Sequence, residues 1–159
     1  MSLYIKEKPD YARQCFDSLL SQTVKASEWV IVEDGPLTPE MYELLEEYEE
    51  KNPGLIKRVP IKVNGGLGPA LAKGIQYCSN ELVARMDTDD IARSDRFEKQ
   101  LKQFIKYPQL DICGSWITEF EDDPKNSVAK RQVPLKESEI RKYQRKRDAS
   151  YFLFRLGTR

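Results

Sequence analysis

Three carboxylates stand within four residues in the segment Asp87-Thr88-Asp89-Asp90. The segment follows an apolar run typical of a buried strand, where mutual repulsion between the carboxylates would be unfavourable unless a cation neutralised it. Hard oxygen ligands suit Mg²⁺ or Mn²⁺, and such an ion would also bridge the oxygens of a diphosphate leaving group. Asp87, Asp89 and Asp90 are therefore candidate metal ligands. The competing interpretation is an acidic helix N-terminus capped by Asp89 or Asp90.

A second acidic turn, Glu33-Asp34-Gly35-Pro36, ends the apolar run Trp29-Val30-Ile31-Val32. Asp34 could accept hydrogen bonds from the ring nitrogen of a nucleobase placed over the edge of a sheet. Ordinary turn chemistry is the competing interpretation, because Asp before Gly-Pro is a common way to end a strand.

The segment Asn64-Gly65-Gly66-Leu67-Gly68 carries glycines that would let the backbone approach a nucleotide. A helix is expected directly after it, and a helix N-terminus favours phosphate. Gly66 is therefore a candidate nucleotide contact, and Lys73 would contact a phosphate if its side chain faced the site. The residue type favours the competing interpretation of Lys73, an exposed helical lysine.

Strand and helix patterns alternate along the first 120 residues. Continuous or alternating apolar residues predict strands, whereas stripes at three- and four-residue spacing predict helices, two of which begin with proline in the first turn. This alternation predicts an α/β fold with a mostly parallel sheet and helices on both faces. Ligands gather beyond the carboxyl ends of such strands, where the two acidic turns stand. The expected strands are 3–5, 29–32, 59–63, 82–86 and 112–117, and the expected helices are 9–22, 39–51, 72–77 and 95–107.

Composition narrows the class of protein. A chain of 159 residues with 40% apolar and 33% charged residues is about one folded domain. It has no histidine, which removes Ser-His and Cys-His nucleophile chemistry and most zinc sites. The three cysteines are far apart, so neither a disulfide framework nor a metal cluster is expected. No apolar run approaches a membrane span and no leader pattern opens the chain, so we expect a cytoplasmic protein without a transmembrane segment.

Charge is distributed unevenly along the chain. Residues 1–123 contain 15 basic and 23 acidic side chains, and residues 124–159 contain 11 basic and 3 acidic ones. We therefore expect an α/β domain over residues 1–123 and a basic, partly ordered segment over residues 124–159. The basic residues are not interleaved with aromatics as in a single-strand binder, so nucleic acid is not an expected partner.

Taken in order, six segments resemble the pattern of the family 2 inverting glycosyltransferases. The resemblance covers about residues 1–120 and implies the GT-A (Rossmann-like) fold, a nucleoside-diphosphate sugar donor and a divalent metal, Mn²⁺ or Mg²⁺. The segments are Met1-Ser2-Leu3-Tyr4, Ser18-Leu19-Leu20-Ser21-Gln22-Thr23, Val30-Ile31-Val32-Glu33-Asp34-Gly35, Asn64-Gly65-Gly66-Leu67-Gly68, Arg85-Met86-Asp87-Thr88-Asp89-Asp90-Ile91 and Asp95-Arg96-Phe97-Glu98-Lys99-Gln100.

The resemblance also implies roles for particular residues. Asp34 matches the base-binding aspartate of the family, and Asp87 and Asp89 match its Asp-x-Asp motif, near ribose and metal, with Asp90 as adjacent support. Tyr4 and Gly66 lie in the matched segments and are candidate nucleotide contacts, and Lys73 is a further candidate outside them. In such enzymes an acceptor hydroxyl displaces the nucleoside diphosphate from the anomeric carbon with inversion, assisted by a general base.

The usual setting of the family implies a UDP-sugar donor, a saccharide or lipid-linked saccharide acceptor, and surface polysaccharide synthesis at the inner face of the membrane. We find no counterpart after Asp123 of the later acidic motif that supplies the base, or of the Gln-x-x-Arg-Trp segment, so the catalytic residue is unknown. The short first strand and this departure suggest truncation at both ends. A non-catalytic nucleotide-sugar-binding module and a sugar nucleotidyltransferase-like enzyme remain alternatives.

Overall fold

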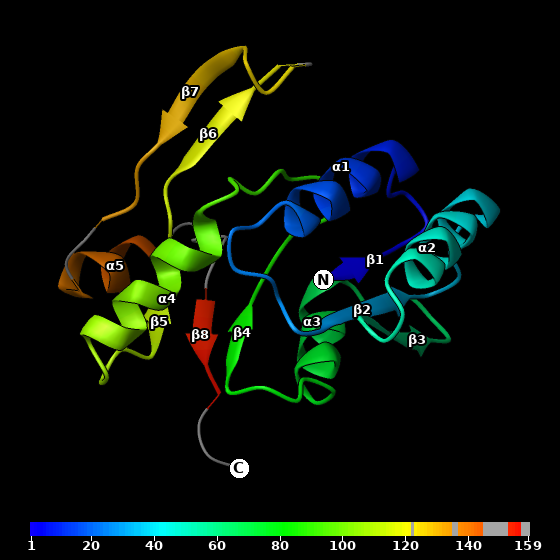
Figure 1. The fold of residues 1–159 in the computed structure, drawn as a ribbon, viewed down its shortest axis with the longest axis horizontal. Helices are drawn as coiled ribbons and strands as arrows, with labels where there is room; N and C mark the ends of the chain where they lie inside the picture. The colour runs from blue at the N-terminus through cyan, green and yellow to red at the C-terminus, as the bar shows by residue number, and fades with distance from the viewer. Residues whose placement is uncertain (122, 135–136, 145–152, 157–159) are drawn as a thin grey trace.

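The computed structural model describes residues 1–121, 123–134, 137–144 and 153–156, and Figure 1 shows its fold. Strands and helices alternate over the first two thirds of the chain, as the sequence predicts. The elements are β1 Ser2–Leu3, α1 Pro9–Leu20, β2 Trp29–Asp34, α2 Pro39–Lys51, β3 Ile56–Ile61, α3 Leu67–Ile75, β4 Leu82–Ala84, α4 Arg96–Lys106, β5 Ile112–Cys113, β6 Ile117–Phe120, β7 Ser127–Arg131, α5 Glu137–Gln144 and β8 Leu153–Arg155.

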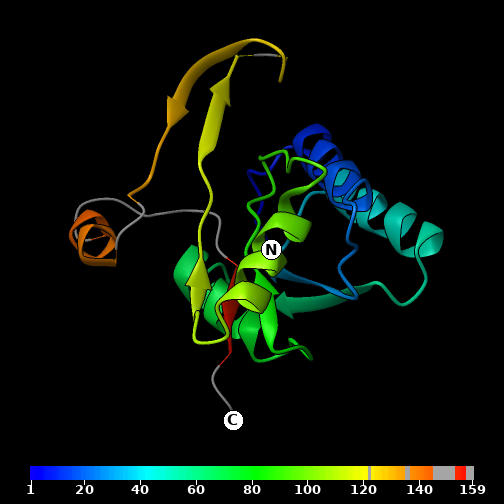
Figure 2. The same ribbon diagram turned by 60° about the vertical axis from the view of Figure 1, so that its left-hand side comes forward.

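A parallel three-stranded sheet in the order β1-β2-β3 forms the centre of the N-terminal half. Side chains of β2 alternate between its two faces. Trp29 and Ile31 join the core under α1 and α2, whereas Val30 and Val32 pack with Ala70 of α3 on the opposite face. The expected parallel sheet with helices on both faces is confirmed for this half of the molecule (Figures 1 and 2).

The ends of the helices follow local sequence signals. Pro9 and Pro39 occupy the first turns of α1 and α2, where a missing backbone N–H costs nothing. The Thr38 hydroxyl accepts a hydrogen bond from the backbone N–H of Met41 at 3.3 Å, so the predicted N-cap of α2 is confirmed.

The second half of the molecule corrects the expectation of one mostly parallel sheet. Strands β4, β8 and β5 form an antiparallel sheet in that order, and β6 and β7 form a separate antiparallel hairpin. The apolar run 112–117, predicted as one strand, divides around Gly114 and Ser115 into β5 and β6. The sheets are therefore mixed.

Described segments after residue 123 pair with strands that precede it. The predicted boundary at 123 falls in the connection of the β6–β7 hairpin, and β8 pairs with both β4 and β5. The hairpin projects away from the layered part of the molecule in both views (Figures 1 and 2). The basic run 145–147 lies outside the described residues.

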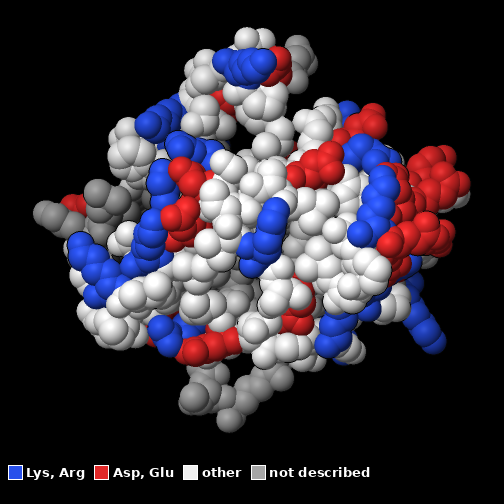
Figure 3. All heavy atoms as spheres, in the orientation of Figure 1, with Lys and Arg blue, Asp and Glu red and all other residues white. Residues whose placement is uncertain are grey.

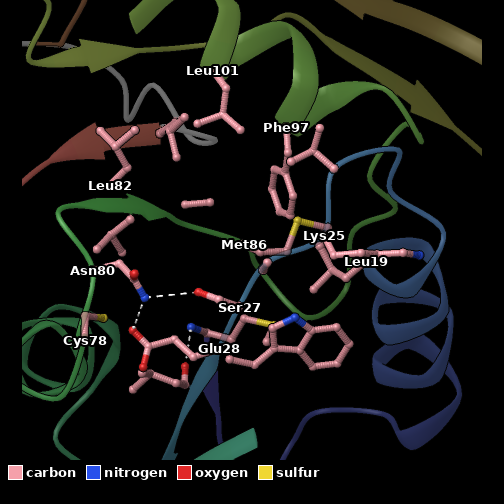
Figure 4. A pocket seen from close by; sticks show the side chains of 18 of the residues that line it. Leu19, Lys25, Ser27, Glu28, Cys78, Asn80, Leu82, Met86, Phe97 and Leu101 are labelled. Carbon is pink, nitrogen blue, oxygen red and sulfur yellow. Dashed lines mark hydrogen bonds between the residues drawn. The ribbon is translucent and has the colours of Figure 1, made fainter. Parts of the chain in front are cut away.

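A hollow of about 430 Å³ lies between the start of β2 and strand β4. Its walls include Leu82, Phe97 and Leu101, and Asn80 bridges its rim through hydrogen bonds to Ser27 and Glu28 at 3.1 and 3.0 Å (Figure 4). No backbone ladder joins β4 to β1 or β2 in the described residues. The two sheets are held together by side-chain packing and by polar bridges of this kind.

Charge is unevenly distributed over the surface that Figure 3 shows. Acidic side chains gather over α2, at the right of Figure 3, and basic side chains gather at the left, over α4. Across the part of the chain that the structure describes, no helix is long and apolar enough to cross a bilayer.

The contact between α3 and β2 gives a first testable prediction. A Cβ placed on Gly74 would lie 2.8 Å from Cγ2 of Val32, closer than packed side chains approach. We expect Gly74→Ala to reduce the free energy of unfolding by about 1–3 kcal/mol through overpacking. Urea denaturation followed by circular dichroism measures the change.

Gly68→Ala is the matched control, because a Cβ on Gly68, in the first turn of the same helix, meets nothing within 4 Å. This control should be neutral or slightly stabilising, since alanine favours a helix more than glycine does. Equal stability of the Gly74→Ala variant and the wild-type chain would contradict the close packing of α3 on β2.

Candidate functional site

The three clustered carboxylates lie in a loop, residues 85–95, that joins β4 to α4; we call it the acidic loop. The interpretation of Asp89 or Asp90 as a helix cap is wrong, because α4 begins only at Arg96. A turn forms instead, in which the backbone N–H of Asp90 donates to the carbonyl of Asp87 at 3.4 Å. Asp89 is exposed, and Asp87 and Asp90 are half-buried.

Arg85 holds the Asp87 carboxylate at the entrance to the loop. Its Nε and Nη2 each donate to a different oxygen of Asp87, both at 3.2 Å. The paired donors of a guanidinium fix the plane of a carboxylate as well as neutralising its charge. Asp87 is therefore held in one orientation, whereas Asp89 remains exposed to solvent.

Helix α1 and the residues directly after it support the acidic loop through two buried polar side chains, Ser18 and Gln22. Gln22, which is 2% exposed, donates to the carbonyl of Arg93 at 2.6 Å and accepts from the backbone N–H of Phe97 at 3.1 Å. Ser18 accepts from the backbone N–H of Ala92 at 3.0 Å. The loop thus keeps its buried backbone groups hydrogen-bonded without being part of a helix or strand.

The other end of the loop is held by Arg96, a buried residue at the start of α4. Its Nη2 donates to the carbonyl of Arg85 at 2.8 Å, and its Nη1 lies 3.0 Å from the sulfur of Met86. The guanidinium thus binds the backbone that precedes the three carboxylates, and ties the two ends of the loop together.

A fourth carboxylate, Glu7, reaches the loop from the β1–α1 connection. Burial raises the pKa of Glu7, and the negative charges of Asp89 and Asp87 raise it further, whereas a hydrogen bond with Thr88 opposes the shift. Sequence analysis did not identify Glu7, because 80 residues separate it from Thr88. Its position increases the negative potential around Asp89.

The thiol of Cys15 lies on the other side of Asp87 and donates to its backbone carbonyl at 3.5 Å. Burial and the charge of Asp90 raise the pKa of Cys15 to about 12, so the thiol stays protonated and acts as a donor. Cys15 is a small buried residue, as its isolation in the sequence indicates.

Asp34 forms a second polar centre at the end of β2. The residue is 3% exposed, and its Oδ1 and Oδ2 accept hydrogen bonds from the backbone N–H groups of Gly65 and Gly66 at 2.8 and 2.9 Å. Gly66 has a φ of +87°, which favours glycine. The structure thus brings Asp34 and Gly66 together, and the carboxylate fixes the glycine turn before α3. Base binding by Asp34 stays a prediction.

Tyr4 and Lys73 occupy different surroundings. Register Leu3↔Glu33 in the β1–β2 pair places Tyr4 opposite Asp34, where its side chain is 39% exposed. Lys73 lies in the last turn of α3, about 10 Å along the helix from Gly66, with its ammonium over the ring of Tyr77. This position favours the interpretation of Lys73 as an exposed helical lysine.

The side chains at the acidic loop suit a divalent ion that is completed by a ligand. Within the described ranges, no three His, Cys, Asp or Glu side chains converge as a metal cluster. Mg²⁺ and similar ions are commonly held by one or two carboxylates together with substrate phosphates and water. The exposed Asp89, with Glu7 and the restrained Asp87 nearby, fits that partial donor set.

The α/β fold thus carries an acidic loop after β4 and a glycine turn after β3. The family model "Glycosyl transferase family 2" matches residues 3–156, and the chain therefore belongs to glycosyltransferase family 2. Membership confirms the resemblance on which the expected fold and donor class depend.

Curated relatives support the same assignment. An uncharacterized glycosyltransferase of Haemophilus influenzae is 46% identical over 92% of this chain and 54% of its own length. The amylovoran biosynthesis glycosyltransferase AmsE of Erwinia amylovora is 38% identical over 91% of this chain and 53% of its own. An Escherichia coli UDP-Gal:alpha-D-GlcNAc-diphosphoundecaprenol beta-1,3-galactosyltransferase is 35% identical over 92% and 52%. The chain spans about half the length of these relatives.

Solved structures show the same fold. The mannosyltransferase PcManGT from Pyrobaculum calidifontis, in complex with GDP-Man and Mn²⁺, superposes with a TM-score of 0.63 at 16% identity, over 74% of this chain and 34% of that one. A fragment of S. aureus TarS in complex with UDP gives 0.57 at 22% identity, over 70% and 33%. The chain is therefore structurally similar to GT-A glycosyltransferases.

The contacts of Gln22 give a second prediction. We expect Gln22→Met, which keeps the volume but removes the polar atoms, to leave the Arg93 carbonyl and the Phe97 N–H without their partner. An unsatisfied buried group costs about 1–3 kcal/mol, so the free energy of unfolding should fall by at least that amount. Chemical denaturation measures the loss, and hydrogen exchange should show faster exchange of the Phe97 amide.

Gln76→Met is the control, since Gln76 is an exposed residue at the end of α3. If the Gln22→Met variant is as stable as this control and its Phe97 amide exchanges at the wild-type rate, the role assigned to the contacts between Gln22 and the acidic loop is contradicted.

Proposed function

We propose that this chain carries the donor site of an inverting, metal-dependent glycosyltransferase that uses a nucleoside-diphosphate sugar, with UDP-sugar as the expected donor. The observation that carries the proposal is the acidic loop, where exposed Asp89 stands beside restrained Asp87 at the end of β4. Membership of family 2 supports the transferase over the nucleotidyltransferase-like alternative.

The proposed division of roles follows the geometry. Asp89 holds a divalent cation, with Glu7 adding negative potential and Asp87 kept in place by Arg85. A bound cation would neutralise the diphosphate and favour its departure from the anomeric carbon. Asp34 and Gly66 shape the turn on the nucleotide side, and Tyr4 lines the same edge of the sheet. The general base is not assigned to a residue of this chain.

The setting of the reaction is proposed from the relatives. AmsE is named for amylovoran biosynthesis, and the E. coli relative is named for a UDP-Gal donor and a diphosphoundecaprenol-linked acceptor. We propose, by analogy, a lipid-linked or polymeric saccharide acceptor in surface polysaccharide synthesis, with the protein working at the cytoplasmic face of the membrane.

The partial donor set predicts that metal and nucleotide bind together. We expect UDP to bind at least about tenfold more tightly with Mn²⁺ than without it, because cation and diphosphate complete each other's coordination. Asp89→Asn should abolish this gain, and Glu7→Gln should reduce it. Isothermal titration calorimetry with UDP, with and without Mn²⁺, measures the effect.

Glu46→Gln is the matched control, an exposed carboxylate on α2 whose loss should leave the Mn²⁺ effect unchanged. Binding of UDP that ignores Mn²⁺, or a Mn²⁺ effect retained in a folded Asp89→Asn variant, would overturn the proposed metal site.

A further inference from the structure

A second cleft, of about 660 Å³, opens next to the acidic loop. One wall is α4, and the other is formed by the start of the β6–β7 hairpin with Trp116. Asp90 and Ile91, which directly follow Asp89, belong to its lining. Its volume falls in the range of about 300–1,000 Å³ that is usual for small-molecule sites.

Trp116 gives this cleft a platform for a ring. The side chain is 45% exposed, which is unusual for so large an aromatic residue, and its Nε1 donates to the carbonyl of Val133 at 3.3 Å. The ammonium of Lys130 lies 5.1 Å from the ring centroid. An indole that is held in place but exposed inside a concave site can stack on the apolar face of a sugar.

The charges that line the cleft favour an anionic ligand. Four cations, Arg93, Arg96, Lys99 and Lys130, line it against two carboxylates, Asp90 and Asp95. Asp95 is paired with Arg93 and Lys99 at 3.1 and 2.7 Å. The excess of positive charge suits a ligand that carries phosphate.

We propose that this cleft binds the acceptor, a saccharide bearing a phosphate group, with its sugar ring on Trp116 and its phosphate near Lys130. The proposal rests on the donor site proposed above, because an acceptor hydroxyl must reach the anomeric carbon beside the acidic loop. The cleft and the loop share Asp90, so an acceptor held there lies next to the reacting centre.

The two tryptophans of the chain allow a direct test, since Trp29 is 4% exposed and Trp116 is 45% exposed. The 159-residue chain is titrated, without nucleotide or metal, with the 1-phosphates of glucose, galactose and N-acetylglucosamine. Acrylamide quenching of tryptophan fluorescence is followed. We expect at least one sugar phosphate to protect Trp116 saturably, and the Trp116→Phe variant to show no change.

Further controls test the contribution of the ligand's phosphate and that of Lys130 separately. The matching methyl glycosides, which lack phosphate, should bind more weakly, and Lys130→Gln should weaken sugar-phosphate binding about fivefold. Lys106→Gln, at the end of α4 and outside the cleft lining, should have no effect.

The proposal is overturned if no sugar phosphate protects Trp116, if inorganic phosphate alone gives the same effect, or if the signal persists in Trp116→Phe. Calorimetry with UDP and Mn²⁺ tests the donor site independently, so that a failure of the cleft proposal can be told from a failure of the donor-site proposal. If UDP binds but no sugar phosphate protects Trp116, only the proposal for the cleft is overturned. If a sugar phosphate protects Trp116 but UDP binding does not depend on Mn²⁺, the cleft loses its proposed role as an acceptor site.

Discussion

The site depends on the buried hydrogen bonds between α1 and the backbone of the acidic loop. A loop that carries several carboxylates and also passes through the interior must satisfy its N–H and C=O groups. Ser18 of α1 and Gln22, which lies just after that helix, do so, and Arg96 binds the carbonyl of Arg85 from the start of α4. The position of Asp89 therefore follows from buried side chains outside the carboxylate cluster.

The same arrangement distributes charge across the loop. Arg85 neutralises Asp87, whereas Glu7 adds negative charge close to Asp89 and has a raised pKa as a result of burial and of that proximity. The loop is thus built with unbalanced negative charge at its exposed end. A site of this kind attracts a cation, and a diphosphate then supplies the remaining ligands.

Sequence patterns predicted the parts of the fold that are decided locally. Helices α1 and α2 have clear apolar stripes and proline in their first turns, and β2 is a short run of β-branched residues between two polar turns. The antiparallel β4-β8-β5 sheet was not predicted, because β8 comes from residues 153–155 and pairs with β5 about 40 residues earlier in the chain. A pairing of this range leaves no signal in either segment.

In the candidate site, too, the local features were predicted from the sequence and the long-range contacts were not. The type and spacing of Asp87, Asp89 and Asp90 pointed to metal chemistry, and the strand that precedes them was evident. Glu7 and Gln22 were not identified, since each acts on the loop from about 70 or more residues away. The carboxylate of Asp34 could not be assigned to the glycine turn for the same reason, although both partners were already candidates.

The central claim is that Asp89 holds a divalent ion only together with a diphosphate. Its most direct test is anomalous diffraction at the manganese edge from crystals of the chain grown with UDP and Mn²⁺. We predict one anomalous peak about 2.0–2.3 Å from a carboxylate oxygen of Asp89 and from diphosphate oxygens, and no such peak in crystals without UDP. Bound UDP with no manganese at Asp89 would contradict the account.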